Sequence, residues 1–249
     1  MQYVWITALC IGGATLLGAL LGFLLGNIPH KWKDAIIGFA AGFMLAAAVF
    51  GLIMPSMETV GSSGIWITAL GILVGALFLS LAGKLAPHLH HLTGVEEGHG
   101  HNEELDKVLL FVMAVAIHKL PGGLASGVGF GGGDVGNAVE VAMAIAIHNI
   151  PEGMMVISLL LLHGVGKMRT ILLAFVIGLV EVIGIFAGFF AASISTALLP
   201  FLLAFSGGTM LYIICDDMIP ETHTHGYERM ATYSILIGFT AMLIFEAMH

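Results

Sequence analysis

The sequence predicts an all-α integral membrane protein with eight transmembrane helices in one domain, residues 1–249. Of its 249 residues, 58% are hydrophobic and 10% are charged, and the mean hydropathy is +1.02. Because soluble proteins carry about 25% charged residues, this chain has too few to cover a surface that faces water. Apolar runs of about 20 residues, long enough to cross a bilayer as a helix, recur along the chain. Most of the surface is therefore expected to face lipid.

Eight apolar runs follow one another with short connections. They cover roughly 3–26, 34–54, 64–86, 108–130, 137–162, 169–192, 197–219 and 230–248. The first run has neither a basic leading segment nor a small-residue cleavage site, so we expect a retained helix rather than a signal peptide. Glycine is frequent inside the runs, and small residues let helix backbones approach closely in lipid. The runs therefore predict closely packed helices.

Basic residues predict how these helices are oriented, because Lys and Arg near helix ends favour the cytoplasmic side. They follow the first, third, fifth and seventh runs, at Lys31, Lys33, Lys84, Lys107, Lys167, Arg169 and Arg229. These four loops share one face of an eight-span protein. We therefore expect them in the cytoplasm, both termini outside, and the protein in the plasma membrane, which is the inner membrane in a bacterium.

Two internal repeats favour a transporter. The segment A-V-A-I-H-K-L-P-G-G (114–123) recurs thirty positions later as A-I-A-I-H-N-I-P-E-G (144–153). The segment F-A-A-G-F-M-L (39–45) in the second run matches F-S-G-G-T-M-L (205–211) in the seventh, and the expected orientation runs these two helices in opposite directions. Inverted repeats are typical of transporters.

Ionisable residues in the middle of the fourth, fifth and sixth runs predict a metal site. They are His118, Lys119, His148, Glu152 and Glu181. Each costs about 2.5 to 3.5 kcal/mol at the bilayer centre, so such residues normally serve an ion path or pair with one another. His148 and Glu152 are four residues apart and share a helix face. Imidazole and carboxylate ligands suit zinc and ferrous iron, and also manganese. His118, His148, Glu152 and Glu181 are the predicted metal ligands.

The backbone beside these residues is expected to be irregular. Pro121 and Pro151 each follow a histidine by three positions, and a proline inside a helix releases the carbonyl one turn back. In lipid this is tolerated only next to protein or a water-filled cavity. The alternative to a metal site is a ligand-free buried network in which Lys119 pairs with a glutamate.

The segment H-N-I-P-E-G (148–153) resembles the fifth-helix motif of the ZIP (Zrt-/Irt-like) family of divalent metal transporters, and G-F-M-L-A-A (42–47) resembles its GufA-like bacterial branch. The resemblance implies a 3+2+3 arrangement in which helices 1–3 and 6–8 form the inverted repeat. It also implies an elevator-type mechanism, in which helices 1, 4, 5 and 6 carry the metal past a scaffold of helices 2, 3, 7 and 8. A homodimer is the usual assembly.

The fourth helix departs from the family pattern. It reads H-K-L-P-G (118–122), whereas binuclear members have H-N-x-P-E. Gly122 replaces the glutamate that bridges two metals, and Lys119 replaces an asparagine that serves the second one. Because an ammonium can take that ion's place, we predict one transport metal, with Asn149 as a neighbour of the site.

We therefore predict a transporter that moves divalent transition metal into the cytoplasm, with zinc as the first candidate and iron, manganese or cadmium as others. The metal is the cargo, and no cofactor is expected.

Two cytoplasmic segments are further candidates for metal binding. The loop 87–106 is rich in histidine, and such tracts commonly bind metal weakly. Its histidines are His88, His90, His91, His99 and His101. A second set lies at the cytoplasmic end of the seventh run and suggests an exit relay: Asp216, Asp217, Glu221, His223 and His225. The alternatives are an acidic linker with incidental histidines and hydrated charges at a helix end.

Other function classes are weaker. The formal charge of −8 leaves no basic surplus for nucleic acid. No H-E-x-x-H metalloprotease motif is present, and Ser126 near His118 fits no established protease motif, so we do not expect an enzyme. A metal sensor that binds without net flux remains an alternative, as does a proton-coupled transporter of another solute that uses the same residues as proton relays.

Overall fold

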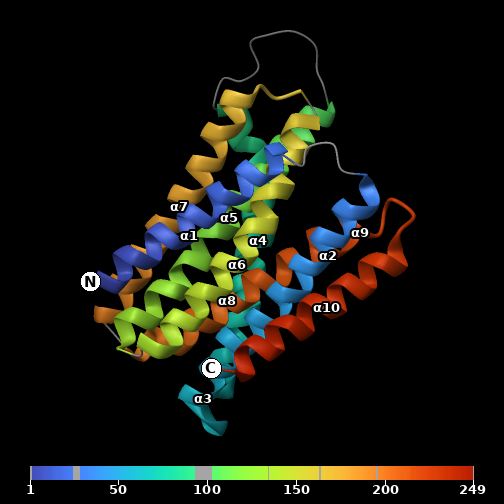
Figure 1. Cartoon of the computed structure of the whole chain (residues 1–249). Coiled ribbons are helices and arrows are strands. Elements are labelled where there is room, and N and C mark those ends of the chain that lie inside the picture. Colours follow the sequence, from blue (N-terminus) through green and yellow to red (C-terminus); the bar gives the residue numbers. More distant parts are fainter. Residues whose placement is uncertain are drawn as a thin grey trace.

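The computed structural model describes residues 2–24, 29–92, 103–133, 135–162, 164–194 and 196–248, and within these ranges the chain is all-helical (Figure 1). The helices in order are α1 (Gln2–Leu24), α2 (His30–Ala46), α3 (Met54–Val60), α4 (Ile65–Leu92), α5 (Glu103–Gly132), α6 (Val135–Leu162), α7 (Lys167–Ile194), α8 (Leu199–Ile213), α9 (Ile219–Thr222) and α10 (Glu228–Ala247). Two π-helical segments, η1 (Ala47–Ile53) and η4 (Ile214–Met218), join α2 to α3 and α8 to α9. Short 3₁₀ turns, η2 (Ser62–Gly64) and η3 (Thr196–Leu198), precede α4 and α8.

Helix occupies all eight predicted apolar runs, so the prediction of an all-α protein is confirmed. Within the described ranges, six helices are long and apolar enough to cross a membrane. At the two ends of the predicted loop 87–106 the chain is helical, because α4 continues to Leu92 and α5 starts at Glu103, and residues 93–102 lie outside the described ranges.

The helices pack as two groups. In the first group, α5 lies along α7 and α1 lies along α6, with α1 also contacting α7. In the second group, α2 lies along α10 and α4 lies along α8. Figure 1 shows α1, α5, α6 and α7 together on one side of the molecule and α2 beside α10 on the other. Contacts of α5 with α8 and of α2 with α6 join the two groups.

Glycine contacts show that the first group is built from two equivalent interfaces. A Cβ atom on Gly18 of α1 would lie 2.2 Å from the carbonyl oxygen of Ile150 on α6. A Cβ atom on Gly184 of α7 would lie 2.4 Å from the carbonyl oxygen of Leu120 on α5. Leu120 and Ile150 occupy the same place in the direct repeat, thirty positions apart. The α1–α6 and α7–α5 interfaces are therefore related by the internal repeats, and small residues bring both pairs of backbones into contact.

The two π-helical segments also occupy corresponding places. Segment η1 follows the repeated segment 39–45, and η4 follows its partner 205–211. Each is followed by a helix with proline as its second residue, Pro55 in α3 and Pro220 in α9. A proline cannot donate to the carbonyl one turn back, so the regular α pattern is interrupted there. The sequence predicted continuous α-helices at both places, whereas the structure has a π-helical segment in each.

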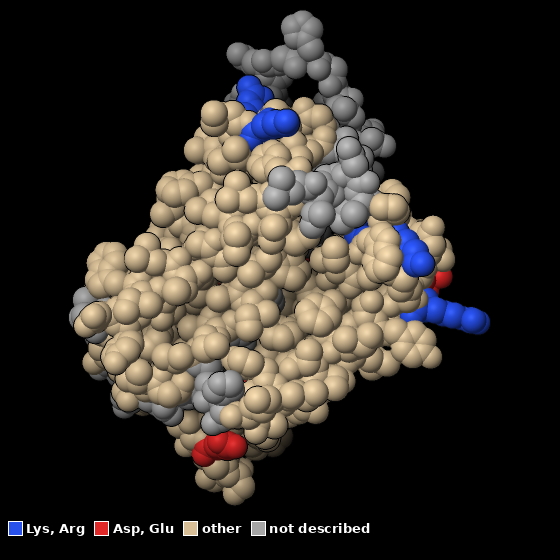
Figure 2. Space-filling model, viewed as in Figure 1, with Lys and Arg blue, Asp and Glu red and all other residues tan. Residues whose placement is uncertain are grey.

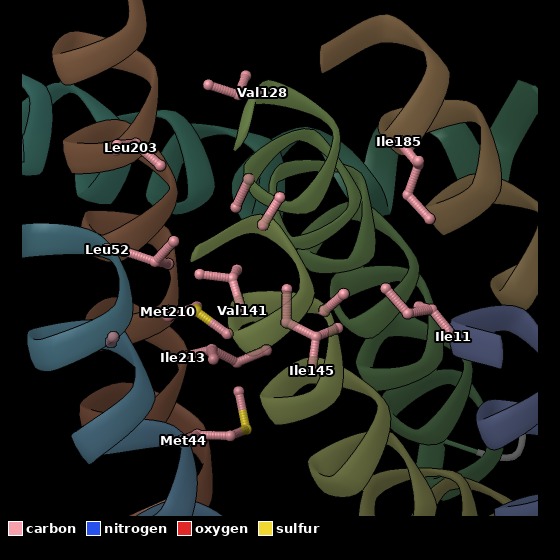
Figure 3. Packing of buried hydrophobic residues seen from close by; sticks show 14 of the residues in the cluster. Ile11, Met44, Leu52, Val128, Val141, Ile145, Ile185, Leu203, Met210 and Ile213 are labelled. Atoms are coloured by element: carbon pink, nitrogen blue, oxygen red, sulfur yellow. The ribbon is translucent and has the colours of Figure 1, made fainter. Parts of the chain in front are cut away.

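The largest buried apolar cluster lies where the two groups meet. Figure 3 shows side chains of α6 facing side chains from α2, η1 and α8. Met44 and Met210, which are equivalent in the inverted repeat, are both fully buried in this cluster. The outer surface is apolar as well, with large hydrophobic side chains exposed on most helices. In Figure 2 the visible face is nearly free of charge between basic groups at its upper and right edges and an acidic group at its lower edge.

Candidate metal centre

A buried cluster of charged and polar side chains lies inside the first helix group. Lys119 comes from α5, Asn149 and Glu152 from α6, Glu181 from α7 and Thr15 from α1. None of the five is more than 4% exposed. The repeats explain why these side chains come together. Lys119 and Asn149 are equivalent in the direct repeat, and the two glycine-packed interfaces hold their helices in the same helix group.

Lys119 lies between two carboxylates. Its Nζ is 2.6 Å from Oε2 of Glu152 and 3.8 Å from Oε2 of Glu181. It also donates a hydrogen bond to Oδ1 of Asn149. An isolated charge in a buried site would be very costly, so mutual pairing is what allows these three charges to lie there.

Asn149 links the cluster across four helices. Its Oδ1 accepts from Lys119, and its Nδ2 donates to Oε2 of Glu181 at 2.8 Å and to the carbonyl oxygen of Ile11 on α1 at 3.3 Å. The hydroxyl of Thr15 donates to the same Glu181 oxygen at 3.4 Å. Because acceptor and donor sides are both engaged, the orientation of the amide is fixed.

The two carboxylate oxygens of Glu181 differ in their surroundings. Oε2 accepts from Asn149 and Thr15 and lies near Lys119, whereas Oε1 is buried without a hydrogen-bond partner among the described residues. Oε1 faces Gly122, where an added Cβ atom would lie 3.7 Å away. One oxygen of Glu181 is therefore held by protein donors, and the other remains available to a ligand.

The two predicted histidine ligands are placed only by their backbones. Residue 118 lies in α5 and residue 148 in α6, and their side chains are outside the described residues. Pro121 and Pro151 lie inside the same helices, which continue through both prolines. The carbonyl oxygen of Pro121 accepts a hydrogen bond from Ser206 of α8 at 2.9 Å. Among the described side chains, no group of three or more His, Cys, Asp or Glu is arranged to hold a metal.

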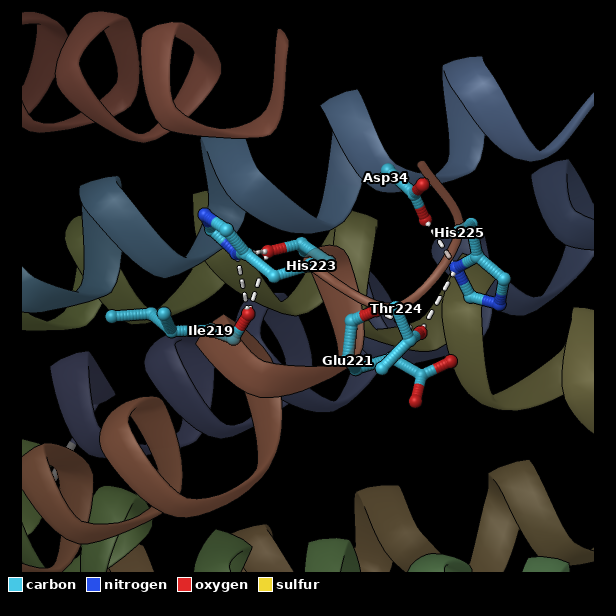
Figure 4. Close-up of polar contacts among 7 residues, drawn as sticks. Asp34, Ile219, Glu221, His223, Thr224 and His225 are labelled. Carbon is cyan, nitrogen blue, oxygen red and sulfur yellow. Dashed lines mark hydrogen bonds and ion pairs between the residues drawn. The ribbon is translucent and has the colours of Figure 1, made fainter. Parts of the chain in front are cut away.

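The predicted exit residues lie along η4, α9 and the loop after it (Figure 4). Asp216 is exposed, and Asp217 and Glu221 are half-buried. The two histidines are engaged separately. His223 Nδ1 lies 2.8 Å from the carbonyl oxygen of Ile219, and His225 Nδ1 lies 3.1 Å from Oδ1 of Asp34 on α2.

The structure describes no side chain of the histidines in the predicted loop. His88, His90 and His91 lie in the last turns of α4, but their side chains are outside the described residues, as are His99 and His101 entirely.

Sequence reasoning missed Thr15 and the Ile11 carbonyl as parts of the cluster. A weak signal existed for Thr15, because it occupies in the first run the place that Glu181 occupies in the sixth when the two repeats are aligned on their glycines. A carbonyl oxygen leaves no signal in a sequence.

Membrane-length helices that enclose paired charges define a class of proteins, those that handle ions inside the bilayer. Comparison with known proteins narrows this class. The family model of the ZIP zinc transporters matches residues 90–246. The zinc transporter GufA of Myxococcus xanthus is 39% identical over 97% of this chain and 96% of its own length. The zinc transporter ZIPB of Bordetella bronchiseptica is 34% identical over 94% of this chain and 77% of its own, and human zinc transporter ZIP11 is 28% identical over 93% and 92%.

The chain belongs to the ZIP zinc transporter family, in its GufA-like bacterial branch. The resemblance found in the motif of residues 148–153 is thereby confirmed. This is a family of multi-pass membrane transporters and not of enzymes.

Proposed function

We propose that the protein transports divalent metal ions, zinc first, through one site enclosed by α5, α6 and α7. The observation that carries this proposal is the pair of buried carboxylates, Glu152 and Glu181, held on either side of the Lys119 ammonium. The relatives named as zinc transporters support the choice of zinc, and the same ligand types also bind iron, manganese and cadmium.

His118, His148, Glu152 and Glu181 are the proposed ligands. Glu181 offers its unpartnered oxygen Oε1, and Glu152 lies one helical turn after His148, on the same face. With Lys119 charged, the metal-free cluster carries one net negative charge and the metal-bound cluster one net positive charge. The magnitude of the buried charge is therefore the same in both states, which favours reversible binding over permanent retention.

A single metal is proposed because the Lys119 ammonium would occupy the place of a second ion. The Lys119 ammonium lies against Glu152 and Asn149, where a second cation would need those same oxygen atoms. Gly122 supplies no carboxylate to bridge two ions, and a Cβ atom added there would lie 3.7 Å from Oε1 of Glu181.

We further propose eight spans in a 3+2+3 arrangement and an elevator-type movement. The helix group α1, α5, α6 and α7 would carry the metal, and the group α2, α4, α8 and α10 would form the scaffold. Their separate packing and the repeat-related interfaces support this division. Exposed basic residues at the starts of α2, α7 and α10 favour a cytoplasmic face there, with both termini outside. Import into the cytoplasm and a homodimer are part of the same proposal.

The cytoplasmic face would then receive the metal. Asp216, Asp217 and Glu221 supply carboxylates near the end of the α8–α9 segment, with His223 and His225 following them. The histidines of residues 88–101 would add weak binding sites on the same side.

Zinc uptake into proteoliposomes tests the proposal. The wild-type chain is compared with Glu152→Gln, and Glu58→Gln serves as the control because Glu58 is an exposed glutamate of α3 outside the cluster. We expect saturable uptake by the wild type and the control and none by Glu152→Gln. Normal uptake by Glu152→Gln would overturn the site, and zinc binding without uptake by the wild type would overturn transport.

A further inference from the structure

A serine of α8 joins the two helix groups by a hydrogen bond. Ser206 is 1% exposed, and its hydroxyl donates to the carbonyl oxygen of Pro121 on α5 at 2.9 Å. Helix α8 belongs to the second group and α5 to the first, and the two helices are in contact. The bond therefore fixes one point of the second group against one point of the first.

The contact around this bond is apolar. Figure 3 shows Val141, Leu203 and Met210 among the side chains that lie between α6 and α8. In such surroundings, a hydroxyl whose acceptor moves away is left unsatisfied, which costs free energy. Apolar side chains that slide past one another exchange one apolar contact for another. A movement between the two groups would therefore lose more at Ser206 than at its apolar neighbours.

The inverted repeat shows that the serine is not required for packing. Ser206 is the second residue of segment 205–211, and its counterpart in segment 39–45 is Ala40. Ala40 is also 1% exposed, so alanine fills an equivalent buried position on α2. Helix α2 contacts α6, where Pro151 is the counterpart of Pro121. Because Ala40 has no hydroxyl, the directional bond exists on the α8–α5 side and cannot form from the equivalent position of α2.

The acceptor lies in the turn of α5 that carries the proposed site. Pro121 comes two residues after Lys119 and directly before Gly122, which faces Oε1 of Glu181. A shift of α5 along α8 would therefore move the site and break the bond together.

We propose that the hydrogen bond between Ser206 and Pro121 is a latch. It holds the first helix group, and the metal site within it, in the arrangement of Figure 1, and it opens whenever that group moves. Ser206 is then a positioning residue that does not touch the metal. The inference rests on the movement between the two groups that is part of the proposed function.

Thiol labelling of a buried cysteine tests the latch. In a protein with Cys10→Ser and Cys215→Ser, Val141→Cys places a thiol where the side chain is 6% exposed and lines a cavity of about 90 Å³ between α5, α6 and α8. A maleimide that carries a charged dye is far larger than this cavity, so it reacts when the groups have moved apart. One hydrogen bond changes an equilibrium constant by about two- to tenfold. We expect Ser206→Ala to raise the rate of labelling in detergent, without zinc, by about that factor.

The matched control is Thr209→Val in the same background. Thr209 is fully buried in α8, and its hydroxyl donates to the carbonyl oxygen of Ser206 at 2.7 Å, within one helix. Its loss should leave the labelling rate unchanged, because this bond does not join the groups. An unchanged rate in Ser206→Ala, or an equal rise in both variants, would overturn the latch. A lack of zinc uptake would instead overturn the proposed transport, since labelling is measured without zinc.

Discussion

Lys119 gives this site its particular chemistry, because it places an ammonium between Glu152 and Glu181 in a fully buried position. A lysine there does two things at once. It neutralises part of the carboxylate charge, and in the proposed single-metal site it would take up the oxygen atoms that a second ion would need. Both effects follow from its distances to the two glutamates.

Replacing Lys119 with Met should therefore leave two buried carboxylates without their cation. Removing one partner of a buried ion pair costs about 3–5 kcal/mol, so we expect a large fall in metal-free stability. Zinc should raise the melting temperature of Lys119→Met more than that of the wild type. Thermal unfolding in detergent with and without zinc measures both, and Lys167→Met, at an exposed lysine, is the control. Unchanged metal-free stability in Lys119→Met would contradict the pairing.

Asn149 is expected to position Glu181. Asn149→Ala removes the 2.8 Å hydrogen bond to Glu181 and leaves buried groups unsatisfied, at a cost of about 1–3 kcal/mol. We expect a higher KM for zinc uptake together with lower stability. Thr15→Val removes only the 3.4 Å contact to the same oxygen and should have a smaller effect on both. Equal KM values for Asn149→Ala and the wild type would show that the amide does not position the ligand.

Part of this chemistry could be predicted from the sequence and part could not. The four-residue spacing of His148 and Glu152 predicts a shared face, and a glutamate in the middle of an apolar run indicates a site. Which carboxylate lies closer to Lys119, and that Asn149 bridges to the Ile11 carbonyl, depend on how four helices pack.

At the scale of the helices, glycine positions determine how closely the backbones approach. The two repeat-related interfaces rely on Gly18 and Gly184, where a side chain would collide with a carbonyl oxygen. Gly13, in the same helix as Gly18, has open space around the position of a Cβ atom. Alanine substitutions at Gly13 and Gly18 therefore distinguish the effect of helix packing on stability from the effect of helix propensity.

Gly18→Ala should destabilise the protein by about 1–3 kcal/mol, the usual cost of overpacking. Gly184→Ala should do the same, because its contact is the equivalent one. Gly13→Ala should be neutral or stabilising by up to about 1 kcal/mol, because alanine is the better helix former. Thermal unfolding of the three variants checks this, and equal effects at positions 13 and 18 would contradict the close approach of α1 to α6.

The π-helical segments are helical features that could not be predicted from the sequence. The apolar runs 34–54 and 197–219 predict helices, and helices are present there. The prolines at positions 55 and 220 agree with an interruption, but the sequence has no signal for its form, which is a π-helical segment in both repeats.

At the scale of the whole molecule, the all-helical character and the places of helix along the chain could be predicted from the apolar runs alone, since each run has to satisfy its own backbone in lipid. Their division into two groups could not, because every run is apolar around most of its circumference. It came from the family resemblance, and the contacts between α5 and α7 and between α2 and α10 support it.

A disulfide between the two groups should stop transport if they move past each other. A Cβ atom on Gly51 of η1 would lie 3.6 Å from Cγ2 of Val141 on α6, so side chains at these two positions would be in contact and a cysteine pair can be placed there. In a protein with Cys10→Ser and Cys215→Ser, we expect oxidation of Gly51→Cys/Val141→Cys to abolish zinc uptake and reduction to restore it.

The control links two helices of the proposed moving group. A Cβ atom on Gly12 of α1 would lie 3.3 Å from Cγ2 of Val182 on α7, so Gly12→Cys/Val182→Cys offers a similar geometry. Uptake should survive oxidation in this control. Full uptake by the oxidised Gly51→Cys/Val141→Cys protein would exclude movement between the two groups.

The central claim is that one metal binds between α5, α6 and α7 while Lys119 occupies the place of a second. A zinc-bound structure with anomalous scattering recorded at the zinc absorption edge tests it directly. We predict one zinc peak inside the first helix group, bound by Glu152 and by Oε1 of Glu181, with Lys119 still beside Asn149. Two peaks between α5 and α6, or none, would contradict the account.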